Sequence, residues 1–231
     1  MIVVLNNKCN LAKDDFQKYM DDLNHICTEH TMILCPSYVN IGLFSSDTIQ
    51  LGAQNVSRED NGAHTGEVSA FQLKSWNVEY CIVGHSERRK DQMETNEDIH
   101  KKIVELLEKD IRPILCVGET DSERKNHQEE NIIGEELDIA LDGLSEEQLE
   151  KVIIAYEPIW SIGTGIVPTN QQIETVFNYI KQKYPNNKVL YGGSVNEENI
   201  EELKKCLSID GYLLGGLSIK TEQLHDFVKK L

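Results

Sequence analysis

Eight short apolar runs, rich in β-branched residues, recur along the whole chain and constrain its fold more than any other feature. They are nearly continuous rather than alternating, which is typical of parallel strands that are covered on both faces. The predicted strands are Ile2–Leu5, Met32–Cys35, Ile49–Ala53, Tyr80–Val83, Pro113–Val117, Val152–Ala155, Lys188–Tyr191 and Gly211–Leu214. Each is followed by a stretch of helical character. The clearest predicted helices are Asp14–Glu29, Asn96–Lys109, Gln128–Leu141, Asn170–Lys183, Glu197–Cys206 and Thr221–Leu231, with shorter ones after Cys35 and Thr65.

Strand and helix alternate without any linker rich in Pro, Gly or Ser and without a shift in composition. This pattern predicts one α/β domain over residues 1–231, in which eight parallel strands close into a (β/α)8 barrel surrounded by helices. A doubly wound open sheet is the alternative. That fold usually carries Gly-x-Gly-x-x-Gly after its first strand, and the residues that follow Leu5 do not contain this motif.

The charge balance excludes two classes of partner. The chain has 23 Lys and Arg against 39 Asp and Glu, a net charge of −16, and no concentrated basic patch for nucleic acid or an anionic membrane.

Met1–Leu5 lacks the basic flank of a signal peptide and no apolar run approaches the ~18 residues of a membrane span, so we expect a cytoplasmic protein. The six cysteines form no Cys-x-x-Cys pair, which predicts free thiols and no metal site.

In a barrel the chemistry lies where the strands end, and two such ends carry groups suited to proton transfer. Glu157 follows the sixth strand, just before Pro158, and the apolar, glycine-containing segment 159–165 after it is typical of a flap that closes over a site. A carboxylate under such a flap is a candidate base. His85 follows the fourth strand at a predicted helix start, where a backbone N–H favours a neutral ring that can act as an electrophile.

Three further strand ends suit an anionic substrate. Asn6 and Lys8 follow the first strand and place an amide and an ammonium at the barrel mouth. The glycine-rich turns at 192–194 and 215–216 follow the last two strands, where barrels commonly bind phosphate through backbone N–H groups. Each feature alone has an ordinary structural interpretation, a solvated lysine or a plain turn, and the combination favours a site.

These residues together resemble the triosephosphate isomerase family, whose fold is the TIM barrel. The resemblance runs from Asn6 to the C-terminus and rests on motifs in matching order. They are Asn6-x-Lys8, Gly62-Ala63-x-Thr65-Gly66-Glu67-Val68-Ser69, Val83-Gly84-His85-Ser86-Glu87-Arg88-Arg89, Cys116-Val117-Gly118-Glu119, Ala155-Tyr156-Glu157-Pro158-Ile159-Trp160, Tyr191-Gly192-Gly193-Ser194-Val195 and Asp210-Gly211-Tyr212-Leu213-Leu214-Gly215-Gly216.

The resemblance implies an enzyme that interconverts dihydroxyacetone phosphate and D-glyceraldehyde 3-phosphate in glycolysis and gluconeogenesis, without metal or cofactor. Glu157 would be the base, and His85, Lys8 and Asn6 would stabilise the enediolate. The residues implied to bind substrate are Asn6, Lys8, Gly163, Ser194, Gly215 and Gly216. The residues implied to contact the catalytic and binding residues from outside the cavity, or to close over it, are Glu87, Ser86, Glu119, Tyr191, Ile162 and Leu214.

The resemblance also implies a homodimer, in which the loop Asn61–Val68 inserts beside the first-strand loop of its partner. Thr65 would then reach Lys8, Cys9 and Glu87 of the partner, and Glu67 would pair with Arg88 across the interface.

The chain departs from the family at the far hinge of the flap, where it has Ile166-Val167-Pro168, and is some twenty residues shorter than usual. These departures leave open an isomerase of a four-carbon ketose phosphate. A non-catalytic, metabolite-binding barrel is a further alternative, which would predict damage at Glu157, His85 or Lys8, and all three are intact.

Overall fold

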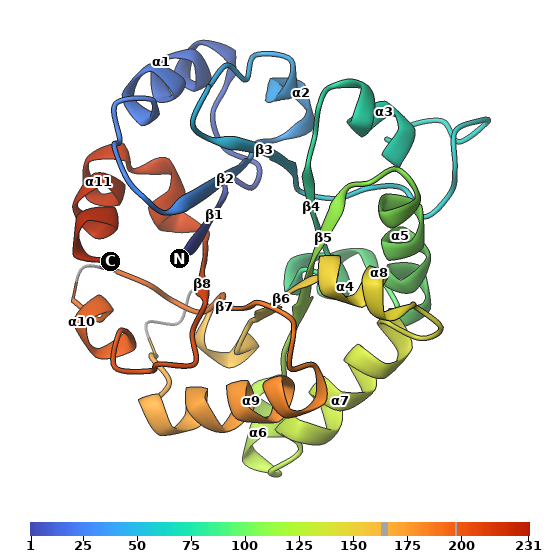
Figure 1. Cartoon of the computed structure of the whole chain (residues 1–231), viewed down its shortest axis with the longest axis vertical. Helices are drawn as coiled ribbons and strands as arrows, with labels where there is room; N and C mark the ends of the chain where they lie inside the picture. The colour runs from blue at the N-terminus through green and yellow to red at the C-terminus, as the bar shows by residue number, and fades with distance from the viewer. Residues whose placement is uncertain (163–165, 197) are drawn as a thin grey trace.

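The chain folds into a closed barrel of eight parallel strands, paired in sequence order (Figure 1). The structure is a computed structural model that describes residues 1–162, 166–196 and 198–231. The strands are β1 (Ile2–Asn6), β2 (Thr31–Cys35), β3 (Gln50–Ala53), β4 (Tyr80–Val83), β5 (Arg112–Val117), β6 (Ile153–Tyr156), β7 (Val189–Tyr191) and β8 (Gly211–Leu214). Pairing of β1 with β8, from Ile2 opposite Gly211 to Leu5 opposite Leu214, closes the barrel. The predicted TIM barrel is confirmed, and every predicted strand is present with its ends shifted by at most one residue.

Helices surround the barrel on its outside (Figure 1). They are α1 (Lys13–Leu23), α2 (Tyr38–Ile41), α3 (Ala70–Ser75), α4 (Ser86–Gln92), α5 (Asn96–Glu108), α6 (Asp121–Lys125), α7 (Glu129–Ala140), α8 (Glu146–Lys151), α9 (Asn170–Lys183), α10 (Ile200–Leu203) and α11 (Thr221–Lys230). Two short 3-10 helices, η1 (Ile159–Ser161) and η2 (Gly216–Ile219), follow β6 and β8.

Two helix predictions were too long. The helix expected over Asp14–Glu29 ends at Leu23, because a turn at Asn24 and His25 brings Ile26 back into the core before β2 begins. The helix expected over Glu197–Cys206 is reduced to α10, although the Asn196 side chain accepts hydrogen bonds from the backbone N–H groups of Glu198 and Asn199 as an N-cap residue would. Residue 197 lies outside the described residues.

Helix starts are specified locally by capping boxes at α3, α5, α6, α8 and α9. At α3, for example, the Ser69 hydroxyl accepts from Gln72 N–H while the Gln72 side chain accepts from Ser69 N–H. Each box satisfies two backbone donors that the first helical turn leaves without partners. These caps therefore fix the residue at which each of these helices begins.

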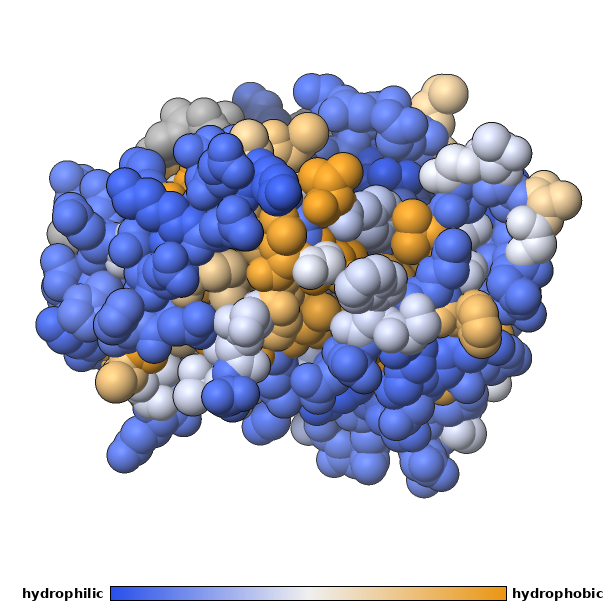
Figure 2. All heavy atoms as spheres, turned by 90° about the horizontal axis from the view of Figure 1, so that it is seen from above, coloured by the Kyte–Doolittle hydropathy of each residue, from blue (hydrophilic) through white to orange (hydrophobic). Residues whose placement is uncertain are grey.

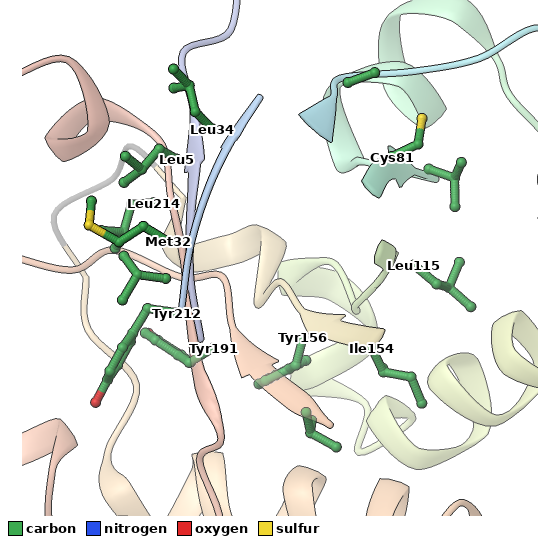
Figure 3. Close-up of a cluster of buried hydrophobic side chains, with 14 of the residues drawn as sticks. Leu5, Met32, Leu34, Cys81, Leu115, Ile154, Tyr156, Tyr191, Tyr212 and Leu214 are labelled. Carbon is green, nitrogen blue, oxygen red and sulfur yellow. The ribbon is translucent and has the colours of Figure 1, made fainter. Parts of the chain in front are cut away.

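The core has two layers, since successive side chains of a strand point to opposite faces. One layer fills the barrel interior and includes Val4, Ile33, Ile82, Ile114, Leu190 and Leu213. The other lies between strands and helices, and Figure 3 shows part of it, including Leu5, Met32, Leu115 and Tyr156. All six cysteines are free thiols, as predicted. Among the described residues, no helix is both long and apolar enough to cross a bilayer.

Candidate active site

A cavity of about 360 Å³ opens at the carboxyl ends of β1, β4, β6, β7 and β8. It brings together most of the side chains that the sequence singled out. The predicted site residues that line it are Asn6, Lys8, His85, Glu157, Ile162, Ser194, Leu214, Gly215 and Gly216. Gly163, predicted to bind phosphate, lies outside the described residues. Among the described residues, the cavity therefore combines one carboxylate, one imidazole, the ammonium groups of Lys8 and Lys220, and two glycine-rich turns.

Glu157 is almost completely buried, with 3% of its surface exposed. Its backbone N–H donates to Val117 O at 2.8 Å, which continues the pairing of β5 and β6 by one residue. Its Oε1 lies 3.0 Å from His85 Nε2, and its Oε2 accepts a hydrogen bond from the Ser86 N–H at 3.0 Å. A Cβ on Gly192 would come within 3.0 Å of the Glu157 Cγ, so the neighbouring turn must be small. The carboxylate is therefore held at a defined place with little water around it.

His85 precedes α4, and its ring is fixed by the start of that helix. The Glu87 N–H donates to His85 Nδ1 at 3.2 Å, so Nδ1 must present a lone pair. In the neutral ring the proton then lies on Nε2, the nitrogen that faces Glu157 and lines the cavity with it. The site thus offers an N–H donor beside a carboxylate.

Lys8 adopts a left-handed backbone conformation, with φ of 50°, which is unusual for a residue with a side chain. Two groups hold it there: Asn6 Oδ1 accepts from the Lys8 N–H at 3.0 Å, and Gln54 Nε2 donates to Lys8 O at 2.8 Å. The Lys8 Nζ lies 2.6 Å from Glu87 Oε1. Partial burial raises the pKa of Glu87, but the bond from Lys8 and the nearby His85 outweigh it and the pKa is lowered.

Two small turns form the opposite wall of the cavity. Ser194 Oγ donates to Ser161 O at 2.8 Å, which ties the turn after β7 to η1. Gly215 precedes η2, and a Cβ there would lie 3.1 Å from the Lys8 Cε. The first N–H groups of a helix have no partner within it, so the start of η2 is suited to an anion.

Glu119 and Tyr191 lie behind the cavity rather than in it. Glu119 is fully buried, and its Oε1 accepts hydrogen bonds from Tyr156 Oη at 3.0 Å and Trp160 Nε1 at 2.7 Å. Burial raises the pKa of Glu119, although these bonds oppose the shift. Glu119 thus contacts η1, which forms the first part of the predicted flap, while the buried Tyr191 ring lies beneath Gly193.

Of the residues predicted for a dimer interface, Thr65, Glu67 and Cys9 are exposed and Arg88 is half-buried. Within the chain, Arg88 Nε binds Glu94 Oε1 at 3.1 Å.

Several residues at the site were not predicted from the sequence. Gln54, which fixes Lys8, stands at the end of β3, so its place at a strand end could have identified it. Asn196, Lys220 and Gln223 also line the cavity, but nothing in the sequence distinguishes them from other polar loop and helix residues. Across 1–162, 166–196 and 198–231, no group of three or more His, Cys, Asp or Glu side chains is arranged to hold a metal ion.

Comparisons with known proteins give the family. A family model described as triosephosphate isomerase matches residues 1–231. A triosephosphate isomerase of Alkaliphilus metalliredigens (strain QYMF) is 41% identical over 236 residues, covering 96% of this chain and 95% of the relative. One of Dictyoglomus turgidum (strain DSM 6724 / Z-1310) is 38% identical over 229 residues, covering 94% and 92%. With a matching barrel and a cavity at the expected strand ends, the chain belongs to the triosephosphate isomerase family.

Proposed function

We propose that this protein interconverts dihydroxyacetone phosphate and D-glyceraldehyde 3-phosphate by proton transfer through an enediolate. One observation carries the proposal: the buried Glu157 carboxylate lies 3.0 Å from His85 Nε2 in a cavity that also contains Lys8. A base, an N–H donor and a cation around one small cavity are the groups that removal of a proton next to a carbonyl requires.

In the proposed reaction, Glu157 takes a proton from the carbon beside the substrate carbonyl. The C–H electron pair becomes a C=C bond as the carbonyl oxygen gains negative charge, which His85 Nε2–H and the Lys8 ammonium stabilise. The proton then returns from Glu157 to the neighbouring carbon, and the hydroxyl proton moves between the two oxygens beside His85. Substrate and product have the same atoms, so the reaction needs no external oxidant or reductant.

The wall of the cavity formed by the turns after β7 and β8 would bind the phosphate. We assign this binding to the backbone N–H groups of Ser194, Gly215 and Gly216, together with Gly163, which lies outside the described residues. The start of η2 and the nearby Lys8 ammonium support this assignment, because both attract a dianion.

The choice of a three-carbon substrate rests on the relatives, both of which are named as triosephosphate isomerases. With that substrate the enzyme would act in glycolysis and gluconeogenesis, in the cytoplasm.

We further propose that the protein acts as a homodimer. Large apolar side chains are exposed on the side formed by α1, α2 and α3, among them Val39 (84%) and Trp76 (57%). Figure 2, which faces this side, shows apolar residues gathered near its middle and hydrophilic residues around them. Monomers rarely leave such a patch uncovered. The Asn61–Val68 loop, which is exposed from Asn61 to Glu67, would reach the partner's Lys8 and Cys9.

Sedimentation velocity tests the dimer. The 26.3 kDa chain should sediment with twice that mass, and Trp76→Glu should give monomers with a reduced kcat. Leu207→Glu is the matched control, because Leu207 is 92% exposed elsewhere, and it should stay dimeric. A monomeric, fully active wild type would contradict the proposal.

Coupled kinetics test the activity. We expect turnover of D-glyceraldehyde 3-phosphate with a kcat/KM in the range of about 10⁴ to 10⁸ M⁻¹s⁻¹ that enzymes reach, and much weaker turnover of a four-carbon ketose phosphate. A preference for the longer sugar would overturn the substrate, and no turnover of either would favour a non-catalytic barrel.

A further inference from the structure

Glu136 is a buried carboxylate that takes no direct part in the proposed proton transfer. It lies on α7, with 8% of its surface exposed, and it is not among the described residues that line the cavity. Its Oε2 accepts a hydrogen bond from the Gly118 N–H at 2.8 Å, and its Oε1 lies 3.3 Å from Arg89 Nη1. A carboxylate buried among apolar residues is costly unless both oxygens are bound, as they are here.

The hydrogen bond between Glu136 and the Gly118 N–H involves a peptide that also binds the backbone of Glu157, the proposed base. The Gly118 N–H belongs to the Val117–Gly118 peptide, and the carbonyl of this same peptide accepts the Glu157 N–H at 2.8 Å. Because a trans peptide is planar, Glu136 and Glu157 bind opposite edges of one rigid unit. The packing there is tight, since a Cβ on Gly118 would lie 1.8 Å from Glu157 O. A tilt of this peptide would therefore move Glu157.

The other partner of Glu136 bears on His85 in the same way. Arg89 Nε donates to Gly84 O at 2.8 Å, and Arg89 Nη2 donates to Cys116 O at 3.2 Å. Gly84 O belongs to the peptide that carries the His85 N–H, so the guanidinium fixes the orientation of the peptide before His85. A single ion pair thus connects the backbone behind both reacting side chains.

We propose that the Glu136–Arg89 ion pair positions Glu157 and His85 for proton transfer, acting through the two peptides behind them. This inference rests on the proposed isomerase activity. Both residues are positioning residues, because neither lines the cavity in the part of the chain that the structure describes. The turns assigned to the phosphate follow β7 and β8, outside these contacts, so the ion pair should affect kcat and leave phosphate binding unchanged.

Steady-state kinetics on D-glyceraldehyde 3-phosphate, with inorganic phosphate as a competitive inhibitor, test this split. Glu136→Leu should lower kcat about tenfold, since small misplacements of reacting groups have effects of this size, and leave the inhibition constant of phosphate within about twofold. Glu136→Gln keeps an oxygen that can accept the Gly118 N–H but loses the ion pair with Arg89, so it should recover only part of the loss. Glu135→Leu is the matched control, because Glu135 is the exposed neighbour on α7, and its kcat should not change.

A second variant, Arg89→Lys, tests the same proposal if Glu136→Leu does not fold. Arg89→Lys keeps the charge but loses the planar group that reaches Gly84 O and Cys116 O, and it should reduce kcat with unchanged phosphate inhibition. A wild-type kcat in the folded variants, or kcat and phosphate affinity falling together, would overturn the inference. No turnover by the wild-type protein would instead contradict the proposed function.

Discussion

The two walls of the cavity are built in different ways. On the wall formed by the ends of β4 and β6, side chains are held by specific bonds: Glu157 by the Ser86 N–H and His85, and His85 by the Glu87 N–H. On the wall formed by β7 and β8, the lining includes the glycine-rich turns at 192–194 and 215–216. Proton transfer needs a few atoms fixed in place, whereas an anion can be bound by backbone N–H groups wherever side chains are small enough to let it approach. The difference predicts that mutations of the first wall change kcat and those of the second change KM.

Lys8 is the residue that should break this division, because it touches both walls. Its Nζ binds Glu87 Oε1, and its Cε lies near Gly215. Lys8→Met should therefore lower kcat and raise KM together, with a loss in kcat/KM of about a thousandfold, as expected when a charge that stabilises the transition state is removed. Steady-state kinetics measure both constants. A loss confined to KM would place Lys8 with the phosphate wall alone.

Glu157→Asp should affect only the first wall. The shorter side chain withdraws the carboxylate from the substrate, and we expect kcat to fall about a hundredfold or more while KM changes little. The same assay measures it, with Glu135→Asp on the surface of α7 as the control. An unchanged kcat would remove Glu157 as the base.

Ser194→Ala should affect only the second wall, and more weakly. The variant keeps the backbone N–H but loses the bond from Ser194 Oγ to Ser161 O that fixes the turn. We expect KM to rise about threefold with kcat unchanged, the effect of one neutral hydrogen bond. Ser122→Ala, in the exposed first turn of α6, should match the wild type. A larger change in kcat than in KM would contradict the division.

A further predicted effect is on stability rather than on catalysis, and it depends on pH. Burial raises the pKa of Glu136 from 4.5 to about 7, although Arg89 and the Gly118 N–H oppose the shift, and Glu123 and Glu157 are the other charged neighbours. Because the folded state holds this proton more tightly than the unfolded state, the contribution to stability is present at low pH and is lost as pH rises from about 4.5 through about 7.

Glu136→Gln does not titrate, so the wild type should lose stability relative to this variant between about pH 5 and 8, by up to a few kcal/mol. Urea midpoints across that range measure the difference, with Glu135→Gln as the control. A difference that stays constant with pH would contradict the shifted pKa.

The barrel and most of the cavity could be predicted from the sequence for one physical reason. Continuous apolar runs mark buried parallel strands, and their carboxyl ends meet at one edge, so Glu157, His85 and Lys8 could be placed together from the residue pattern alone. Contacts across the fold could not be predicted in this way. Helical spacing along α7 places Glu136, unlike Glu135, on the buried face, but the partners of its carboxylate depend on how α7 packs against the barrel. Likewise, α1 ends at Leu23 because the chain turns there and buries Ile26 in the core.

Hydrogen exchange at carbon tests the central claim, that Glu157 moves a carbon-bound proton, most directly. Dihydroxyacetone phosphate incubated with the wild-type protein in D₂O should acquire deuterium at the carbon that bears its hydroxyl, as followed by NMR. Glu157→Gln should abolish both this exchange and isomerisation, while inorganic phosphate still binds with unchanged affinity. Deuterium incorporation by Glu157→Gln at the wild-type rate would contradict the account.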